Sequence, residues 1–171
     1  MKLLKIFVLT ILLNYFFLSF SNSEIIKQIK VEGNDRISDE VILMFSDINL
    51  GQDIKSSKVN EIIKNLYETK FFNNVSVTLE SNLISITVDE APLIENVIIS
   101  GIKAKKIQEQ IRKNFILKTR TSFNDFQLLQ EVSYIESTLK SLGYYFAKVE
   151  PFTETLDNNM VNIEYKIDLG K

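Results

Sequence analysis

The stretch IKVEGNDRIS, residues 29–38, places the end of a strand, a turn and the start of a helix within ten residues. Ile29 and Val31 alternate with charged residues, which is typical of a half-buried strand. Gly33 and Asn34 both tolerate positive φ angles, so they predict a turn. This arrangement would fold the first helix back over a sheet within a few residues, and the residues that follow indicate such a helix.

Two helices are predicted after this turn. Ser38 predicts an N-cap, and the two acidic residues that follow it are favoured near the positive end of the helix dipole. Gly51 ends the first helix, and the second begins near Ser56 or Ser57. Apolar residues recur at helical spacing in both and are expected in a core: Val41, Met44, Phe45 and Ile48, then Val59, Ile62, Ile63 and Leu66.

A β-hairpin completes this unit. Apolar residues alternate with polar ones over residues 75–80 and again over 84–89, with a turn at Ser81 and Asn82. Pro92 closes the unit. The order is therefore β-α-α-β-β in about 68 residues, with the helices expected on the apolar face of the sheet.

The same order then repeats. Residues 97–100 form a predicted strand that ends at Gly101, and Asn124 with Gln127 predicts a helix start of the capping-box kind. Gly143 lies where a helix C′ glycine belongs. Strands are expected from Tyr145 and over residues 161–169, with a turn between them. The sequence thus predicts an α+β fold of two tandem modules, over residues 24–92 and 93–171.

The first 23 residues differ from the rest. A short basic start precedes a mostly apolar run, Ile6–Phe20, which as a helix would span roughly 22 Å, less than the roughly 30 Å of a bilayer core. Small residues follow at Ser21 and Ser23. This pattern predicts a signal peptide, residues 1–23, cleaved before Glu24, and the alternative is an uncleaved membrane anchor.

Composition excludes several kinds of chemistry. The chain has no His and no Cys, so Ser-His-Asp and Cys-His mechanisms, disulfides and the usual zinc sites are excluded. No glycine-rich phosphate loop is present. The net charge of −2 argues against a nucleic-acid partner. We expect no catalytic residue, no metal and no cofactor.

Both modules resemble the POTRA domains of BamA-like outer-membrane protein assembly factors. The segments that carry the resemblance are IKVEGNDRIS, IIKNLYETKFFNNVSVTL, LISITVDEAPLIENVIISG and STLKSLGYYFAKV. Two positions depart from the pattern: Lys70 stands where the family often has Gly, and Gly101-Ile102 replaces Gly-Asn. The resemblance implies that each sheet is three-stranded and mixed, with two helices on one face, the last strand central and the second at an edge.

The resemblance also implies a function. It suggests a non-enzymatic periplasmic scaffold of an outer-membrane protein, which binds assembly subunits and unfolded outer-membrane protein chains. The family's membrane contact is a C-terminal β-barrel, which is expected to lie outside this chain. The alternatives are the POTRA region of a partner-specific outer-membrane exporter and a free-standing periplasmic protein-binding module. A secreted enzyme and a small-ligand binder are the remaining classes.

The expected mode of binding is strand addition, because edge strands carry unpaired N–H and C=O groups. The candidate edge residues of the first module are Asn74, Val75, Ser76, Val77, Thr78, Leu79 and Glu80. Those of the second are Ala147, Lys148, Val149 and Glu150, with the strand continuing to Thr155. Pro151 fits an edge but lacks a donor, so the first edge is expected to be the better acceptor. Gly33, Asn34, Gly101 and Gly143 are expected to serve only as structural turn positions.

Overall fold

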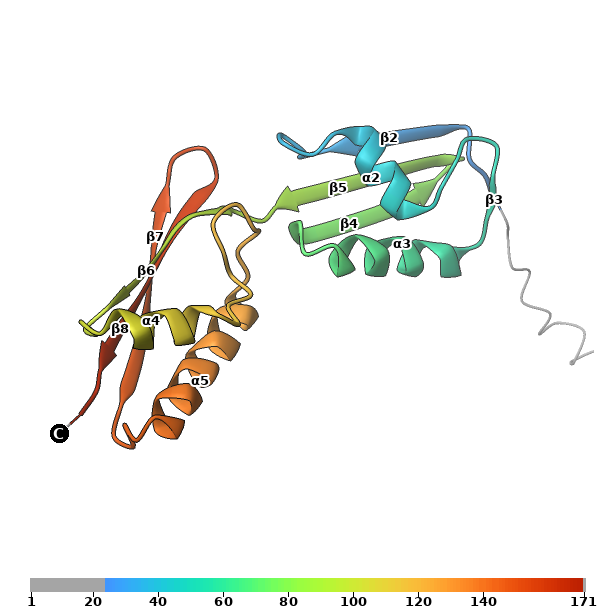
Figure 1. The fold of residues 1–171 in the computed structure, drawn as a ribbon. Coiled ribbons are helices and arrows are strands. Elements are labelled where there is room, and N and C mark those ends of the chain that lie inside the picture. The colour runs from blue at the N-terminus through green and yellow to red at the C-terminus, as the bar shows by residue number, and fades with distance from the viewer. Residues whose placement is uncertain (1–23, 171) are drawn as a thin grey trace, which may run out of the picture.

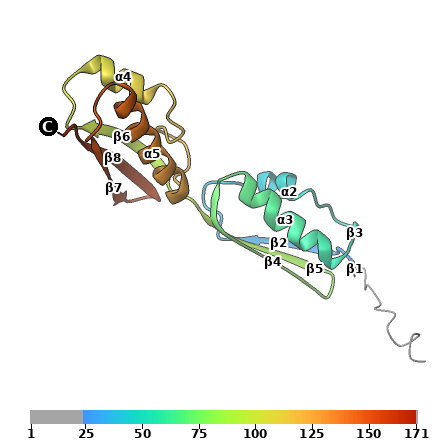
Figure 2. The same cartoon turned by 90° about the horizontal axis from the view of Figure 1, so that it is seen from below.

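The computed structural model describes residues 24–170, so the predicted signal peptide lies outside the described residues. These residues form two α+β modules joined by a short extended connection (Figures 1 and 2). Each module has two helices on one face of a three-stranded mixed sheet, which confirms the predicted fold class. Over residues 24–170 no helix is long and apolar enough to cross a membrane.

The first module has its last strand in the centre of the sheet. The sheet order is β2-β5-β4, with β5 parallel to β2 and antiparallel to β4. The helices lie between β2 and the hairpin in the chain. The elements are β1 (Glu24–Ile25), β2 (Gln28–Glu32), α2 (Asp39–Ser46), β3 (Asp53–Ile54), α3 (Ser56–Glu68), β4 (Phe72–Glu80) and β5 (Leu83–Glu90).

The first predicted strand is in fact two short ones. β1 leaves the main sheet and pairs with β3 in a small antiparallel ladder of two residues each. The connection between β1 and β2 includes Ile26, which is buried in the core, and its N–H donates to the carbonyl of Gln52. Such a short ladder leaves no alternation to detect in the sequence.

The buried face of α2 differs from the predicted one. Met44 was expected in the core, but it is 65% exposed, whereas Ile42 is fully buried. The helix ends at Ser46, so Ile48 enters the core from the following loop. With only eight residues, this helix cannot establish a face by periodicity, because a rotation of one residue exchanges which apolar side chains are buried.

The second module repeats the topology with the sheet order β6-β8-β7. Asn124 is the N-cap of α5, and its side chain accepts the N–H of Gln127 at 3.1 Å, as predicted. The predicted strand from Tyr145 begins three residues later, and Tyr145 and Phe146 are exposed. The elements are β6 (Leu93–Ser100), α4 (Lys105–Arg112), α5 (Asp125–Ser141), β7 (Lys148–Leu156) and β8 (Met160–Asp168).

Each module has its own core, and both cores are built from residues between Ile26 and Ile167. In each, one face of the central strand lies under the helices: Ile84, Ile86 and Val88 in β5, and the alternate residues from Val161 to Ile167 in β8. This burial is the main stabilising term for domains of this size. The described residues thus include a separate core for each module.

Candidate functional site

Strand β4 forms an open edge of the first sheet. It pairs only with β5 within the described residues, over a register from Phe72↔Glu90 to Glu80↔Leu83. Val75 and Val77 point into the core and Leu79 is half-buried, while Asn74, Ser76, Thr78 and Glu80 are exposed. All seven candidate residues of the first module thus lie in one edge strand.

The hydrogen bonds of Val75 show which backbone groups point outward from β4. Its N–H donates to the hydroxyl of Tyr67 at 3.1 Å, so this N–H is directed away from β5. Because backbone groups alternate in direction along an antiparallel strand, the N–H and C=O groups of Val77 and Leu79 also face the open side. Tyr67 in turn donates to Asn74 Oδ1 at 3.1 Å and so covers the start of this edge.

Strand β7 is the corresponding edge of the second sheet. Lys148, Val149 and Glu150 belong to it, whereas Ala147 is buried just before it. Pro151 lies within β7 opposite Tyr165. Since proline has no N–H, it fits a strand only where that position faces away from the ladder, and the outward row of β7 therefore lacks one donor at its centre.

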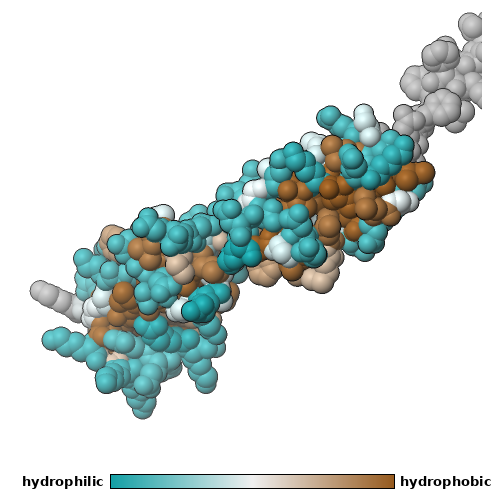
Figure 3. All heavy atoms as spheres, turned by 90° about the horizontal axis from the view of Figure 1, so that it is seen from above, coloured by the Kyte–Doolittle hydropathy of each residue, from teal (hydrophilic) through white to brown (hydrophobic). Residues whose placement is uncertain are grey.

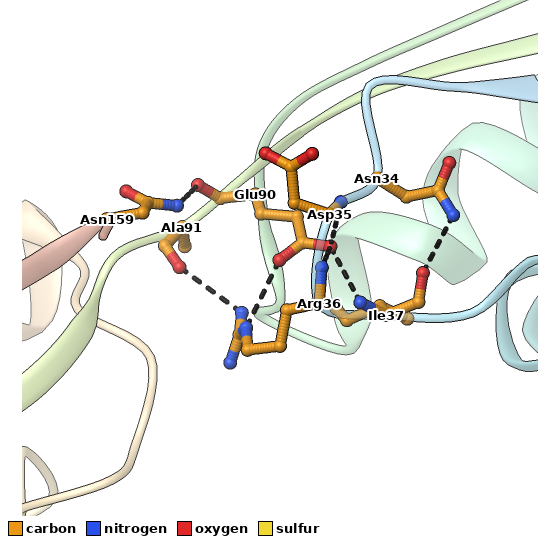
Figure 4. A network of polar contacts seen from close by, with 7 residues as sticks. All are labelled: Asn34, Asp35, Arg36, Ile37, Glu90, Ala91 and Asn159. Atoms are coloured by element: carbon orange, nitrogen blue, oxygen red, sulfur yellow. Dashed lines mark hydrogen bonds and ion pairs between the residues drawn. The ribbon is translucent and has the colours of Figure 1, made fainter.

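The turn after β2 is closed by the carboxylate of Glu90 at the end of β5. Oε1 of Glu90 accepts the backbone N–H groups of Asp35, Arg36 and Ile37 at 3.1, 3.0 and 2.8 Å. Its Oε2 accepts the Arg36 Nε–H at 3.1 Å (Figure 4). Glu90 is 6% exposed, so this is a buried carboxylate whose charge is met by four donors.

Two opposing effects set the pKa of Glu90. Burial raises the pKa, but the hydrogen bonds from Ile37 and Arg36 and the guanidinium charge of Arg36 outweigh burial, so the pKa lies below its ordinary value. The carboxylate is therefore ionised at neutral pH. Sequence reasoning missed this role, because no local pattern shows that an acid at the end of one strand reaches a turn more than fifty residues earlier.

Glycines allow each first strand to turn close to the central strand. Gly33 has a φ of +83°, and a Cβ there would lie 2.1 Å from the carbonyl oxygen of Val88. Gly101 has a φ of +85° and would meet the carbonyl oxygen of Ile167 at 1.8 Å. Asn34 is different: its side-chain amide donates to the Ile37 carbonyl and to Asp39 Oδ1, both at 2.8 Å. Gly143, at φ +96°, follows the C-cap of α5.

The two modules are joined by hydrogen bonds around the connection. Asn159, in the β7–β8 turn, donates from Nδ2 to the Glu90 carbonyl at 2.8 Å and accepts the Leu93 N–H at 3.0 Å. Arg36 Nη2 donates to the Ala91 carbonyl at 3.4 Å, and the Phe123 N–H donates to the Pro92 carbonyl at 2.7 Å. Glu90 and its neighbours therefore link the first turn of one module to two loops of the other (Figure 4).

A second buried carboxylate lies inside the second module. Glu131 is 2% exposed; it accepts the Leu117 N–H at 2.7 Å, the Ile116 N–H, and the hydroxyl of Tyr165 at 2.5 Å. Burial raises the pKa of Tyr165, and the adjacent Glu131 carboxylate raises it further. This pair fixes the loop after α4 to the central strand, which is a structural role.

An apolar groove lies on the side of the first module opposite β4. It is lined by Ile29, Leu43, Met44, Ile48 and Leu50, with Glu40, Asp47 and Asn49 also along it. Figure 3 shows apolar surface gathered on this α2 side of the module. Met44 and Leu50 are exposed by about two thirds. Among residues 24–170, no cluster of acidic side chains is suited to hold a metal ion.

Comparison with known proteins identifies the fold family. The family model for POTRA, described as surface antigen variable number repeat, matches residues 24–91 and again 92–170. The chain therefore belongs to the POTRA family and consists largely of two such domains.

Among curated proteins, the outer membrane protein assembly factor BamA of Neisseria meningitidis is 31% identical over 150 residues. That match covers 85% of this chain and 19% of the relative, so the chain spans about a fifth of the relative's length. The corresponding factor of Neorickettsia risticii is 22% identical over 156 residues, covering 91% of this chain and 21% of the relative.

Among solved structures, the N-terminal domain of Omp85 from Thermosynechococcus elongatus matches with a TM-score of 0.58 and 15% identity. That match covers 87% of this chain and 64% of the other. POTRA1-2 of the periplasmic domain of Omp85 from Anabaena matches with a TM-score of 0.51 and 16% identity, and that match covers 88% of this chain and 98% of the other. These likenesses support the tandem POTRA fold.

Proposed function

We propose that this chain is the periplasmic part of an outer-membrane protein assembly factor similar to BamA. In this role it is a non-enzymatic scaffold behind a signal peptide, residues 1–23, with modules over 24–92 and 93–171. Membership of the POTRA family and the likeness to BamA of Neisseria meningitidis support the assignment. Its partners are assembly subunits and unfolded outer-membrane protein chains.

The mode of binding is strand addition at β4. The observation that carries this proposal is the open edge itself, at which the N–H and C=O groups of Val77 and Leu79 face away from β5. An extended chain beside β4 would satisfy these groups and continue the sheet. An unfolded chain that alternates apolar and polar residues offers the matching backbone, and this suits a scaffold for barrel strands before they fold.

An NMR titration tests this mode. The polypeptide 24–171 is titrated with a soluble peptide of alternating Thr and Val, and the amide shifts of β4 are followed. We expect the shifts to centre on Val77 and Leu79, with new protection of their amides from hydrogen exchange. The β7 edge is an internal control, because Pro151 interrupts its row of donors. Shifts confined to α2 and α3 would contradict strand addition.

A further inference from the structure

Three cationic side chains line one cleft between the modules. Arg36 comes from the turn after β2, Lys70 from the turn between α3 and β4, and Arg120 from the loop between α4 and α5. The cleft has a volume of about 360 Å³, and Phe71, Leu93 and Ile116 give it an apolar wall. In Figures 1 and 2 the loop that carries Arg120 lies on the side of the second module that faces the first.

Two of these cations occupy an unusual backbone conformation. Lys70 has a φ of 62° and Arg120 a φ of 67°, a region in which Gly or Asn is the easier residue. Hydrogen bonds to β6 hold the second of them: the Arg120 N–H donates to the Ile94 carbonyl at 2.7 Å, and the Ile94 N–H donates to the Thr121 carbonyl at 2.9 Å. Lys70 directly follows the C-cap of α3, where a left-handed residue commonly ends a helix, so at this position the charged side chain, more than the backbone, departs from the usual choice.

The positive charge of the cleft is largely uncompensated. No carboxylate among residues 24–170 forms an ion pair with Lys70 or Arg120, and none of the described lining residues is acidic. Arg36 uses two guanidinium nitrogens on Glu90 and Ala91, and Figure 4 shows the third directed away from them. This local excess occurs in a chain whose net charge is −2, so it favours a bound anion.

The cleft is continuous with the open edge of the first sheet. A neighbouring hollow of about 470 Å³ shares Lys70 with it and is lined by Phe72, at the start of β4, by Tyr67, Phe123 and Phe126, and by one acidic residue, Asp125. Because Tyr67 covers the edge at Val75, a chain paired antiparallel with β4 would leave the sheet there, with its C-terminal end directed toward Phe72 and the cations.

We propose that the junction cleft binds a carboxylate side chain near the C-terminal end of a polypeptide that pairs antiparallel with β4. This inference rests on the proposed strand addition and adds a specificity to it. A polypeptide fits better than a membrane surface, since the cations lie in a hollow between two modules that a flat bilayer could not enter.

Two peptides test the inference. Both are acetylated and amidated, alternate Thr and Val, and end in Gly-Glu-Glu or in Gly-Gln-Gln, so that only side-chain charge differs. We expect the glutamate peptide to bind the polypeptide 24–171 about fivefold more tightly, a preference that weakens as salt is added.

The double variant Lys70→Asn/Arg120→Asn should lose the preference for the glutamate peptide and keep its fold, because Asn tolerates the left-handed region. Lys103→Asn, in an exposed loop outside the cleft, should retain it.

The outcomes separate the two proposals. Equal affinity of both peptides, with shifts along β4, would overturn the carboxylate site and leave strand addition standing. No shifts along β4 with either peptide would overturn strand addition and this inference with it. Binding to phosphatidylglycerol vesicles that requires Lys70 and Arg120, without discrimination between the two peptides, would instead assign the cleft to anionic lipid and refute the inference.

Discussion

The carboxylate of Glu90 shows how much one residue determines in this chain. It closes the first turn through three backbone N–H groups and holds the guanidinium of Arg36, which also reaches the connection between the modules. A buried carboxylate is stable only when its charge is satisfied in this way. Glu90 therefore links the turn after β2 in the first module to the connection that leads into the second module.

Replacing Glu90 by Gln should destabilise the first module by about 2 kcal/mol, because a neutral amide oxygen accepts these bonds less strongly and leaves Arg36 without its partner. Native-state hydrogen exchange of the β2 and β5 amides measures this loss. Asp89→Asn, an exposed neighbour, is the control and should change little.

The destabilisation should also depend on pH. Because the pKa of Glu90 is lowered in the folded state, its stabilisation is present above the unfolded pKa of about 4.3 and is lost as pH falls through the folded value. The wild type and Glu90→Gln should therefore converge in stability in acid. A constant difference between them down to pH 2 would contradict the assigned role.

A second residue-scale prediction concerns Tyr165. Tyr165→Phe removes the hydroxyl that donates to buried Glu131 at 2.5 Å, so the second module should lose about 1 to 2 kcal/mol. Tyr145→Phe, at a position that is 71% exposed, should leave stability unchanged. Hydrogen exchange of the β8 amides measures the stability of the second module in each of these two variants. Equal stability of both variants would show that the buried hydrogen bond contributes nothing.

At the scale of elements, the two open edges differ at a proline. β4 and β7 each pair antiparallel with a central strand, but Pro151 removes a donor from the middle of β7. We therefore propose that the β4 edge is the better acceptor of an added strand.

Replacing Pro151 by Val should make β7 an acceptor, since it restores the missing N–H in a β-favouring residue. The alternating Thr/Val peptide should then shift amides from Val149 to Thr155 that it leaves unchanged in the wild type. As a control, the β4 shifts in the same spectra should be unaltered. If the β7 amides do not shift in the variant, a feature other than the proline prevents strand addition at this edge.

Most elements could be predicted from the sequence, and the failures have physical reasons. Period-2 alternation identified β4, β5 and β8, because one face of each is buried over several residues. The buried face of α2 was assigned wrongly at Met44, and the β1–β3 ladder was missed, because both elements are too short for periodicity. Glu90, Glu131 and the cationic cleft depend on contacts between distant segments, which no local pattern encodes.

At the scale of the whole molecule, the junction is specified by few contacts. The connection between Glu90 and Leu93 is only two residues long, and Asn159 bonds on both sides of it. Its side chain holds the Glu90 carbonyl, while its own carbonyl accepts from Leu93. One turn of the second module therefore limits the angle at which the first can lie.

Replacing Asn159 by Gly should loosen the junction without weakening either core, because Gly accepts the positive φ of 55° but lacks the amide that bonds Glu90. Residual dipolar couplings of the two modules should report a wider range of relative orientations. Asn158→Gly, whose φ is 59°, removes a neighbouring side chain of the same kind and should leave the couplings unchanged. Identical couplings in both variants would show that Asn159 does not restrain the angle.

The central position of β5 has a mechanical consequence. The chain leaves the first module from the end of β5, which pairs with β2 on one side and β4 on the other. It enters the second module along β6, whose neighbouring strand in the sheet is β8 and whose first residues also bond to the loop at residues 120–122. A tensile load passing between the modules is thus shared by two ladders in shear on one side of the connection and by a single ladder on the other. Under such a load the first module acts as the firmer anchor, and the second is the one that yields.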